Sequence, residues 1–182
     1  MLTIVPEVVV SLALTSHIYR RSDTVENHPH LAVTAYLKSP DVIVVEIRGE
    51  FDSGTVLEDS FRLEHFEWYD LTTDRIVDKT PFPGTCDPRL DMEPRNVVEL
   101  THRQPLKTYK LLDNVDPGAD PVRMLEAGHK YRIMLKPQRL WWIAKTKAEL
   151  FREKKVIPIE ELPDPPLLRL ECSDELILEV EN

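Results

Sequence analysis

Histidine is the side chain best suited to proton transfer near neutral pH, and three histidines stand where they can act. His65 shares one face of a predicted strand with the apolar residues Phe61 and Leu63, which places it in an apolar wall. His102 and His129 stand near predicted strand ends, where an acid or base can meet a ligand. Each of the three also has a purely structural explanation, as a core or surface histidine.

Metal and cofactor chemistry has little support in the sequence. His28 and His30 would share one face of an extended segment, but a metal would need a third ligand from elsewhere, and a solvated loop end explains the pair more simply. The sequence has no Gly-rich phosphate loop, H-E-x-x-H helix, G-x-S-x-G elbow or dinucleotide fingerprint, so we predict no metal and no cofactor. Cys86 and Cys172 lack metal-site spacing, and whether they pair is left open.

Aromatic side chains are the strongest indication of a site. A buried Trp needs a partner for its indole N–H, so adjacent aromatic pairs at the ends of elements often line pockets or interfaces. Packing beneath a late insertion in the chain is the alternative explanation for the same rings. We predict a pocket that binds a hydrophobic small-molecule substrate and is shaped by rings from distant parts of the chain: Trp68, Tyr69, Tyr109, Trp141 and Trp142.

Polar groups near these rings supply the chemistry of such a pocket. Arg132, Lys136 and Arg139 precede Trp142 closely and can bind an anionic or enolic group, or simply remain solvated. We predict that the catalytic groups, which donate or accept a proton, are His65, Tyr131 and Arg132.

Composition narrows the range of partners. The chain has 182 residues, with 23 Lys plus Arg against 32 Asp plus Glu and a formal charge of -9. Such a charge repels phosphate backbones and anionic lipid heads, so we expect neither nucleic acid nor membrane as a partner. The apolar run Val8–Leu14 has no basic residue before it and reads as a strand, not a signal core, so we expect a cytoplasmic protein. The sequence leaves open whether the chain forms a homodimer.

Strands must position most of these residues. Apolar side chains occupy alternate positions in Glu7–Thr15 and Leu31–Leu37, the period of a strand with one buried face, and the polar stretch His17–His30 between them reads as a loop. Val42–Ile47 is a β-branched run except for Glu46, typical of a strand buried on both faces. Further strands are predicted at Ser60–Tyr69, Arg75–Val77, Val97–Leu100, Leu106–Leu112, Lys130–Leu135, Leu167–Cys172 and Glu175–Val180.

The connections are stiff, and only one helix is predicted. The 15 Pro against 5 Gly favour long, extended loops, as in Asp78–Pro94. Lys145–Lys154 reads as a short helix with Thr146 as its N-cap, and Trp141–Trp142 opens this insertion. We therefore predict one all-β domain over residues 1–182, an antiparallel immunoglobulin-like β-sandwich, with a β-barrel as the alternative.

Several stretches resemble a group of small uncharacterised fungal β-sandwich proteins. They are Phe61-Arg62-Leu63, Tyr69-Asp70-Leu71-Thr72-Thr73, and Met124-Leu125-Glu126-Ala127-Gly128-His129 with Tyr131-Arg132-Ile133 and Trp142. In that group a hairpin with a D-L-T-T turn precedes an L-x-P-G-like turn and a strand that ends near a Trp; here Ala127 stands where the group has Pro. The likeness covers about two-thirds of the chain and lies in turns and strand patterns.

A further resemblance, carried by no residue match, is to cofactor-free hetero-Diels–Alderases of fungal meroterpenoid pathways. It implies a natural-product cyclase or dehydrating pericyclase, which needs an apolar pocket and one or two polar groups. The competing hypothesis is a non-catalytic module that binds another protein through a sheet edge or an aromatic patch.

Overall fold

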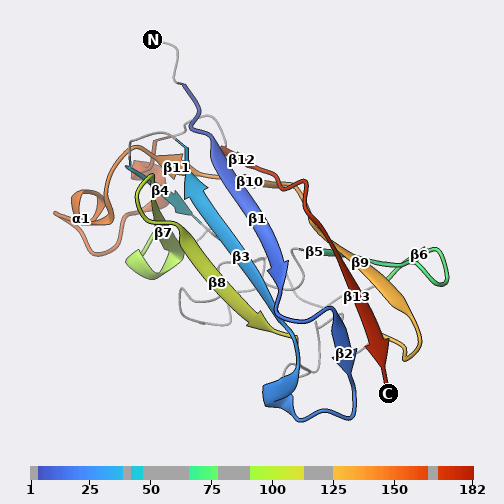
Figure 1. The fold of residues 1–182 in the computed structure, drawn as a ribbon. Coiled ribbons are helices and arrows are strands. Elements are labelled where there is room, and N and C mark those ends of the chain that lie inside the picture. Colours follow the sequence, from blue (N-terminus) through green and yellow to red (C-terminus); the bar gives the residue numbers. More distant parts are fainter. Residues whose placement is uncertain (1–3, 39–41, 47–65, 78–90, 113–124, 164–167) are drawn as a thin grey trace.

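The protein is built mainly from strands, arranged in two larger sheets and two smaller groups. The computed structural model describes residues 4–38, 42–46, 66–77, 91–112, 125–163 and 168–182. The first large sheet has three strands that pair antiparallel and lie side by side through the middle of Figure 1. Their order is β1 (Val8–Leu14), β3 (His30–Leu37) and β8 (Leu106–Leu111).

The second large sheet has five strands, four of which are joined by antiparallel pairs. Its order is β2 (Ile18–Arg20), β13 (Glu175–Glu181), β9 (Lys130–Leu135), β5 (Phe66–Asp70) and β6 (Arg75–Ile76). The exception to the antiparallel pattern is the pair of β2 and β13, which is parallel. Figure 1 shows β13 and β9 beside each other and β2 at the end near the C-terminus.

Strand β4 confirms the expectation of a strand buried on both faces. β4 (Val42–Glu46) lies between β11 (Trp142–Ile143) and β7 (Val97–Thr101), and β10 (Gln138–Leu140) pairs with β12 (Leu168–Leu170). Ile43 and Val45 join the main hydrophobic cluster, whereas Val44 joins a second, smaller one. The β-branched run therefore reflects two cores, one on each side of the strand.

Alternating apolar side chains place one face of each large sheet on a common core. Burial of a large apolar side chain stabilises the fold by roughly 1.5–3 kcal/mol, so this cluster holds the two sheets together. The outer edge of β1 is also tied to the other sheet, because the backbone N–H of Leu12 donates to Asp174 Oδ2 over 2.9 Å. The cluster contains, from β1 and β3, Val8, Val10, Leu12, Leu31, Val33, Ala35 and Leu37, and, from β5, β9 and β13, Phe66, Trp68, Tyr131, Ile133, Leu135, Leu176, Leu178 and Val180.

Two local predictions need correction. The loop predicted over His17–His30 contains β2 and a short 3-10 helix, Val25–Asn27, because Tyr19 is buried and Glu179 donates its backbone N–H to the carbonyl of His17. These contacts reach across the whole sequence and leave no local pattern. The sequence also predicted no strand at Trp142, which begins strand β11 ahead of the helix because it pairs with Val45 of β4.

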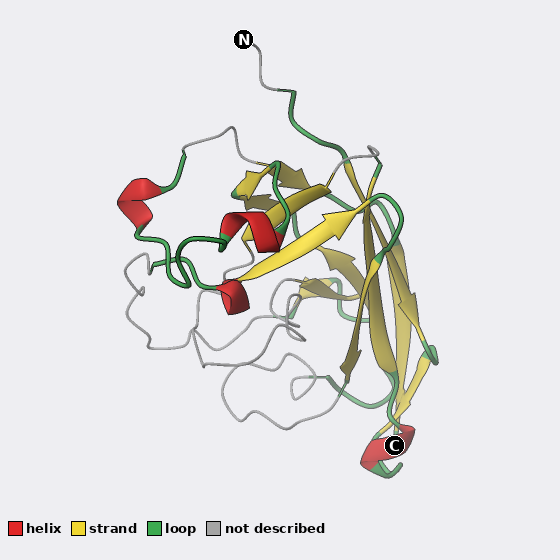
Figure 2. Cartoon of the chain, turned by 90° about the vertical axis from the view of Figure 1, so that its left-hand side faces the viewer, coloured by secondary structure: helices red, strands yellow, loops and turns green. Residues whose placement is uncertain are grey.

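The short helix itself is confirmed. α1 (Lys147–Leu150) has Thr146 as its N-cap, with a capping box in which Thr146 and Glu149 satisfy each other's backbone N–H groups. The other helices in the described ranges are 3-10 turns at Val25–Asn27, Pro94–Asn96 and Ile159–Glu161. Figure 2 shows the helices confined to the connections between strands. The described chain is thus mostly β, with open, largely antiparallel sheets and one α-helix.

Candidate functional site

The turn after β5 is organised by the carboxylate of Asp70. Its Oδ1 accepts the backbone N–H groups of Thr72 and Thr73 over 2.8 and 3.2 Å, and its Oδ2 accepts the Thr73 hydroxyl over 2.7 Å. Asp side chains favour turns for this reason, because they satisfy backbone groups that a strand no longer pairs. Asp74, which follows, has a left-handed φ of 58°. The D-L-T-T stretch is therefore a self-capped hairpin turn.

The turn before β9 is held by the hydroxyl of Tyr131. Leu125 is fully buried, Gly128 has a φ of 85°, and the Gly128 N–H donates to the carbonyl of Val180 over 2.7 Å. The side chain of Tyr131 points back towards the preceding turn, where its hydroxyl oxygen accepts the backbone N–H of Glu126 over 2.7 Å. The ring is almost entirely buried, so this hydrogen bond fixes the turn from inside the core.

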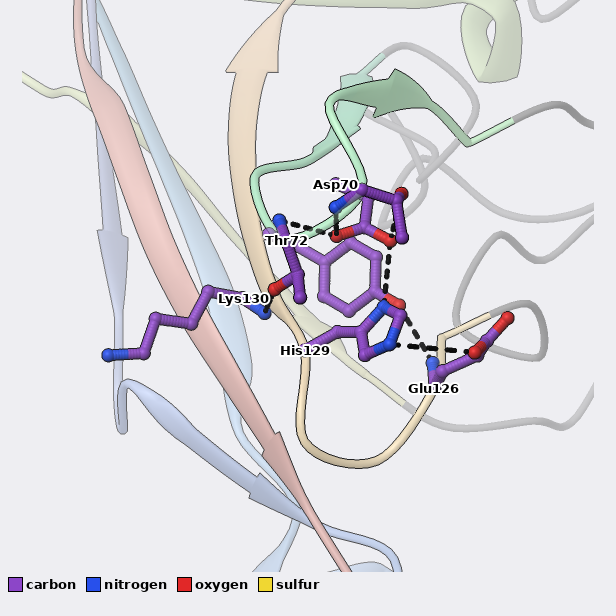
Figure 3. Close-up of polar contacts among 7 residues, drawn as sticks. Asp70, Thr72, Glu126, His129 and Lys130 are labelled. Carbon is purple, nitrogen blue, oxygen red and sulfur yellow. Dashed lines mark hydrogen bonds and ion pairs between the residues drawn. The ribbon is translucent and has the colours of Figure 1, made fainter.

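His129 joins these two turns (Figure 3). Its Nδ1 lies 2.8 Å from Asp70 Oδ2, and its Nε2 lies 3.6 Å from Glu126 Oε2. One more hydrogen bond supports the junction, because the backbone N–H of Lys130 donates to the side-chain hydroxyl oxygen of Thr72, Oγ1, over 3.0 Å. The side chains of His129 and Asp70 keep only 19% and 10% of their surface exposed, whereas Glu126 keeps 73%. We call Asp70, Glu126, His129 and Tyr131 the corner cluster.

Hydrogen bonding dominates the electrostatics of the corner cluster. Burial by itself raises the pKa of Asp70, but the bonds from Thr73 and His129 and from the backbone of Thr72 and Thr73 more than offset it and lower the pKa to about 2. Burial raises the pKa of Tyr131. Asp70 is therefore a carboxylate throughout the physiological range, and Tyr131 a neutral phenol.

The corner cluster has one arrangement that acid–base chemistry uses. A carboxylate that is hydrogen-bonded to one imidazole nitrogen orients the ring and leaves the other nitrogen to exchange a proton. In this cluster the carboxylate is Asp70, and the nitrogen left for proton exchange is His129 Nε2, beside the exposed Glu126. The same contacts also have a structural use, since they fasten two hairpin turns to each other. No group of three or more His, Cys, Asp or Glu within the described ranges has an arrangement that could hold a metal ion.

Two predicted site residues, Tyr69 and Arg132, do come together. They face each other on β5 and β9, with the guanidinium carbon of Arg132 4.9 Å from the centre of the Tyr69 ring. The Tyr69 hydroxyl donates to Asp74 Oδ1 over 2.6 Å, and Arg132 Nε has no hydrogen-bond partner in the described part of the chain. Both side chains lie on the outer face of the five-stranded sheet, opposite the core side on which Tyr131 lies.

The tryptophans lie in two different hydrophobic clusters. Trp68 and Trp142 belong to the main core, 2% and 5% exposed, and Trp141 belongs to the smaller cluster with Val44 and Met92. The Trp141 indole N–H donates to the carbonyl of Pro163 over 2.9 Å. Trp141, which packs with the partly buried Leu150 and Phe151, matches the alternative of packing beneath the insertion, whereas Trp68 and Trp142 pack in the main core instead.

The remaining predicted residues are elsewhere. Tyr109 stands on β8 with 61% of its surface exposed. His65 and Cys86 lie outside the described residues, so their predicted roles have no structural counterpart here; Cys172 donates its thiol to the carbonyl of Val10. Sequence reasoning assigned no role to Asp70 and Glu126, although both belong to the two turn motifs that it singled out.

The outer face of the sheet formed by β1, β3 and β8 is almost free of charge. Strand register places ten side chains outward on β1, β3 and β8, of which only Lys107 carries a formal charge. Its two largest residues, Tyr36 and Tyr109, are 38% and 61% exposed. We call this surface the tyrosine face; it consists of Val9, Ser11, Ala13, His30, Ala32, Thr34, Tyr36, Lys107, Tyr109 and Leu111.

The outer face of the five-stranded sheet is rich in charge. Of its twelve outward residues seven are charged, and two ion pairs form among them, Arg20–Glu181 at 2.9 Å and Lys130–Glu179 at 3.3 Å. We call it the charged face; it consists of Ile18, Arg20, Glu67, Tyr69, Ile76, Lys130, Arg132, Met134, Glu175, Ile177, Glu179 and Glu181.

Comparison with protein-family models, with curated proteins and with solved structures finds no match for this chain in any of the three. In the ranges that the structure describes, none of the helices has the length and apolar character needed to cross a membrane.

Proposed function

We propose that the chain is a non-catalytic interaction module, an immunoglobulin-like β-sandwich that binds another protein through the tyrosine face. The observation that carries this proposal is the ten-residue outer surface with a single formal charge, in a chain of which 30% of the residues are charged. Exposed surface of this kind, poor in charge and bearing Tyr, is typical of protein interfaces.

The corner cluster supports the immunoglobulin-like part of the proposal. Sandwiches of that kind carry a tyrosine whose hydroxyl bonds back to the backbone a few residues upstream, at the corner where the chain changes sheet. Here the Tyr131 hydroxyl accepts the N–H of Glu126, five residues upstream, at the start of β9. Tyr131 then has a structural role, and the corner would fix the sheet geometry that presents the outer faces.

The placement of the aromatic residues favours binding over catalysis in a pocket. Trp68, Trp142 and Tyr131 contribute to the core, so their rings stabilise the fold from within. Tyr36 and Tyr109 instead offer large, fairly rigid rings to a partner, and such residues supply much of the affinity of protein interfaces. The proposed partner surface is therefore outside the sheets.

The test is the size of the complex in extracts of source cells that were treated with a chemical cross-linker before lysis, so that a weak complex is retained. We expect the wild-type chain to elute with a partner, and Tyr36→Asp and Tyr109→Asp to elute at the size of the free chain. Ile177→Asp is the matched control on the charged face, where the new carboxylate stands opposite Arg132. Elution of all four proteins at one size would refute the proposal.

A second candidate function, cofactor-free catalysis on a hydrophobic small molecule, is favoured by the Asp70–His129 contact. In this proposal His129, oriented by Asp70, would move a proton at Nε2 during a cyclisation, and the predicted groups Tyr69 and Arg132 would lie on the adjacent outer face. With a panel of enolic substrates, His129→Gln should abolish turnover and Tyr36→Asp should leave it unchanged. Equal rates for wild type and His129→Gln would exclude it.

A further inference from the structure

We infer that the partner bound by the tyrosine face is a second copy of this chain. The inference rests on the proposed interaction function and adds the identity of the partner. Two copies that each carry a formal charge of -9 repel one another, and this repulsion is smallest where the faces that meet carry little charge. The tyrosine face carries only Lys107, a charge of +1, whereas the charged face carries three basic and four acidic residues.

The tyrosine face is self-complementary in shape, because the outward residues on one side of its central strand, β3, are small and those on the other side are large. On the β1 side the outward residues Ser11 and Ala13 are small, and on the β8 side, in the same two rows, stand Lys107 and Tyr109. A twofold axis that runs along β3 between two stacked sheets places β8 of one copy over β1 of the other. Each Tyr109 then covers Ala13 of its partner copy, so large residues meet small ones across the interface.

The same axis makes residues on β3 meet their own counterparts. Thr34 and Ala32 are small enough to let the two sheets approach, and the Tyr36 rings of the two copies come together at one end of the strand. Lys107 stands over Ser11 of the other copy, away from the second Lys107. No like charges of the tyrosine face are therefore brought into opposition.

The size of the face sets the expected affinity. Three strands spaced about 4.8 Å apart, with about 3.4 Å per residue over the length of β3, present a footprint of roughly 400 Å². A stable interface buries about 800 Å² per partner, so this dimer should be weak, with a dissociation constant in the micromolar range or above.

Sedimentation equilibrium of the purified full chain, from about 1 μM to about 1 mM, tests the inference. We expect a monomer–dimer equilibrium that strengthens as salt rises, because salt screens the repulsion between two acidic chains. Thr34→Asp should weaken it about tenfold or more, since the axis brings the two new carboxylates together. Ile177→Asp should leave it unchanged, and circular dichroism confirms that both variants are folded.

Cysteine cross-linking tests the position of the axis. In a chain with Cys86→Ser and Cys172→Ser, Thr34→Cys should give a covalent dimer with a short bifunctional thiol reagent, because the axis places position 34 of one copy against position 34 of the other. Ile177→Cys on the charged face should not. Dimerisation without preferential cross-linking of Thr34→Cys would overturn this geometry.

The two proposals fail in different ways. If the purified chain stays monomeric at every concentration while the complex in extracts still depends on Tyr36 and Tyr109, the second-copy inference is wrong and the interaction function stands. If neither the purified chain nor the extract shows association through these residues, both are wrong.

Discussion

The two large sheets bury the same kinds of side chain and expose different ones. Their inner faces contribute to one cluster of Val, Leu, Ile and aromatic residues, but outside, the charged face has seven formal charges among twelve residues and the tyrosine face one among ten. The charged face satisfies part of its charge within the chain, through two ion pairs. Stability thus depends on the shared interior, and the proposed binding depends on the outer face that carries a single formal charge.

The largest expected effect is a loss of stability that distinguishes the inner from the outer face of β5. Trp68→Ala removes a ring that is 2% exposed in the core, and it should lower the free energy of unfolding by about 4 kcal/mol. Tyr69→Ala, the next residue, removes only the contact with Arg132 and the bond to Asp74, so its loss of stability should be several-fold smaller. Urea unfolding measures both, and equal losses would contradict the division into inner and outer faces.

Acid should loosen the end of the five-stranded sheet where the corner cluster lies. Because the pKa of Asp70 is lowered to about 2 in the folded state, its carboxylate adds stability above its ordinary pKa near 4, and this contribution, about 2 kcal/mol, is lost as the pH falls towards 2. Asp70→Asn should remove this part of the pH dependence, whereas Asp74→Asn should keep it. Unfolding free energies across that pH range provide the measurement; parallel curves for wild type and Asp70→Asn would be inconsistent with the corner.

Two tyrosines offer a matched pair, one in each sheet. Tyr131→Phe deletes the hydroxyl that accepts the Glu126 N–H in the buried corner, and should cost about 1 kcal/mol in thermal or chemical unfolding. Tyr109→Phe, at a residue 61% exposed, should leave stability unchanged. A loss for Tyr109→Phe equal to that for Tyr131→Phe would argue that the tyrosine face contributes to folding.

The smallest effect concerns the ion pairs of the charged face. Lys130 and Glu179 form their pair with 57% and 44% of their side chains exposed, so Lys130→Gln should change the free energy of unfolding by less than about 0.5 kcal/mol. Unfolding at low and high salt measures this small contribution of the ion pair to the free energy of unfolding. A change above about 1 kcal/mol would mean that the ion pairs of the charged face contribute appreciably to stability.

The sequence predicted the strands well where their signal is local. Alternation in β1 and β3, the β-branched run of β4 and the Thr146 cap of α1 each reflect a preference written within a few neighbouring residues. It missed β2, because a segment of only three residues, Ile18–Arg20, becomes a strand only when β13, more than 150 residues further along the chain, supplies the hydrogen bonds. Short strands of this kind have no period to detect.

The candidate site was predicted only in fragments. The sequence drew attention to the D-L-T-T and L-E-A-G-H turns and to the aromatic residues. It assigned five rings to a pocket, and three of them, Trp68, Trp141 and Trp142, are buried in hydrophobic clusters. Large aromatic side chains suit a core and a binding site equally well, so their type does not decide between the two. Tyr36 lies in a segment that the sequence predicted only as a strand, Leu31–Leu37, and nothing in the sequence marked it as a binding residue.

The sequence by itself determined the all-β character of the chain, the inward face of its main strands and its acidic charge, because periodicity and composition are local properties. Only the tertiary structure decided that His129 meets Asp70 and that the outward residues of β1, β3 and β8 form one surface nearly without charge. The physical reason is register: which side chains become neighbours depends on hydrogen bonds between strands far apart in the chain, and the residues of one strand do not encode that pairing.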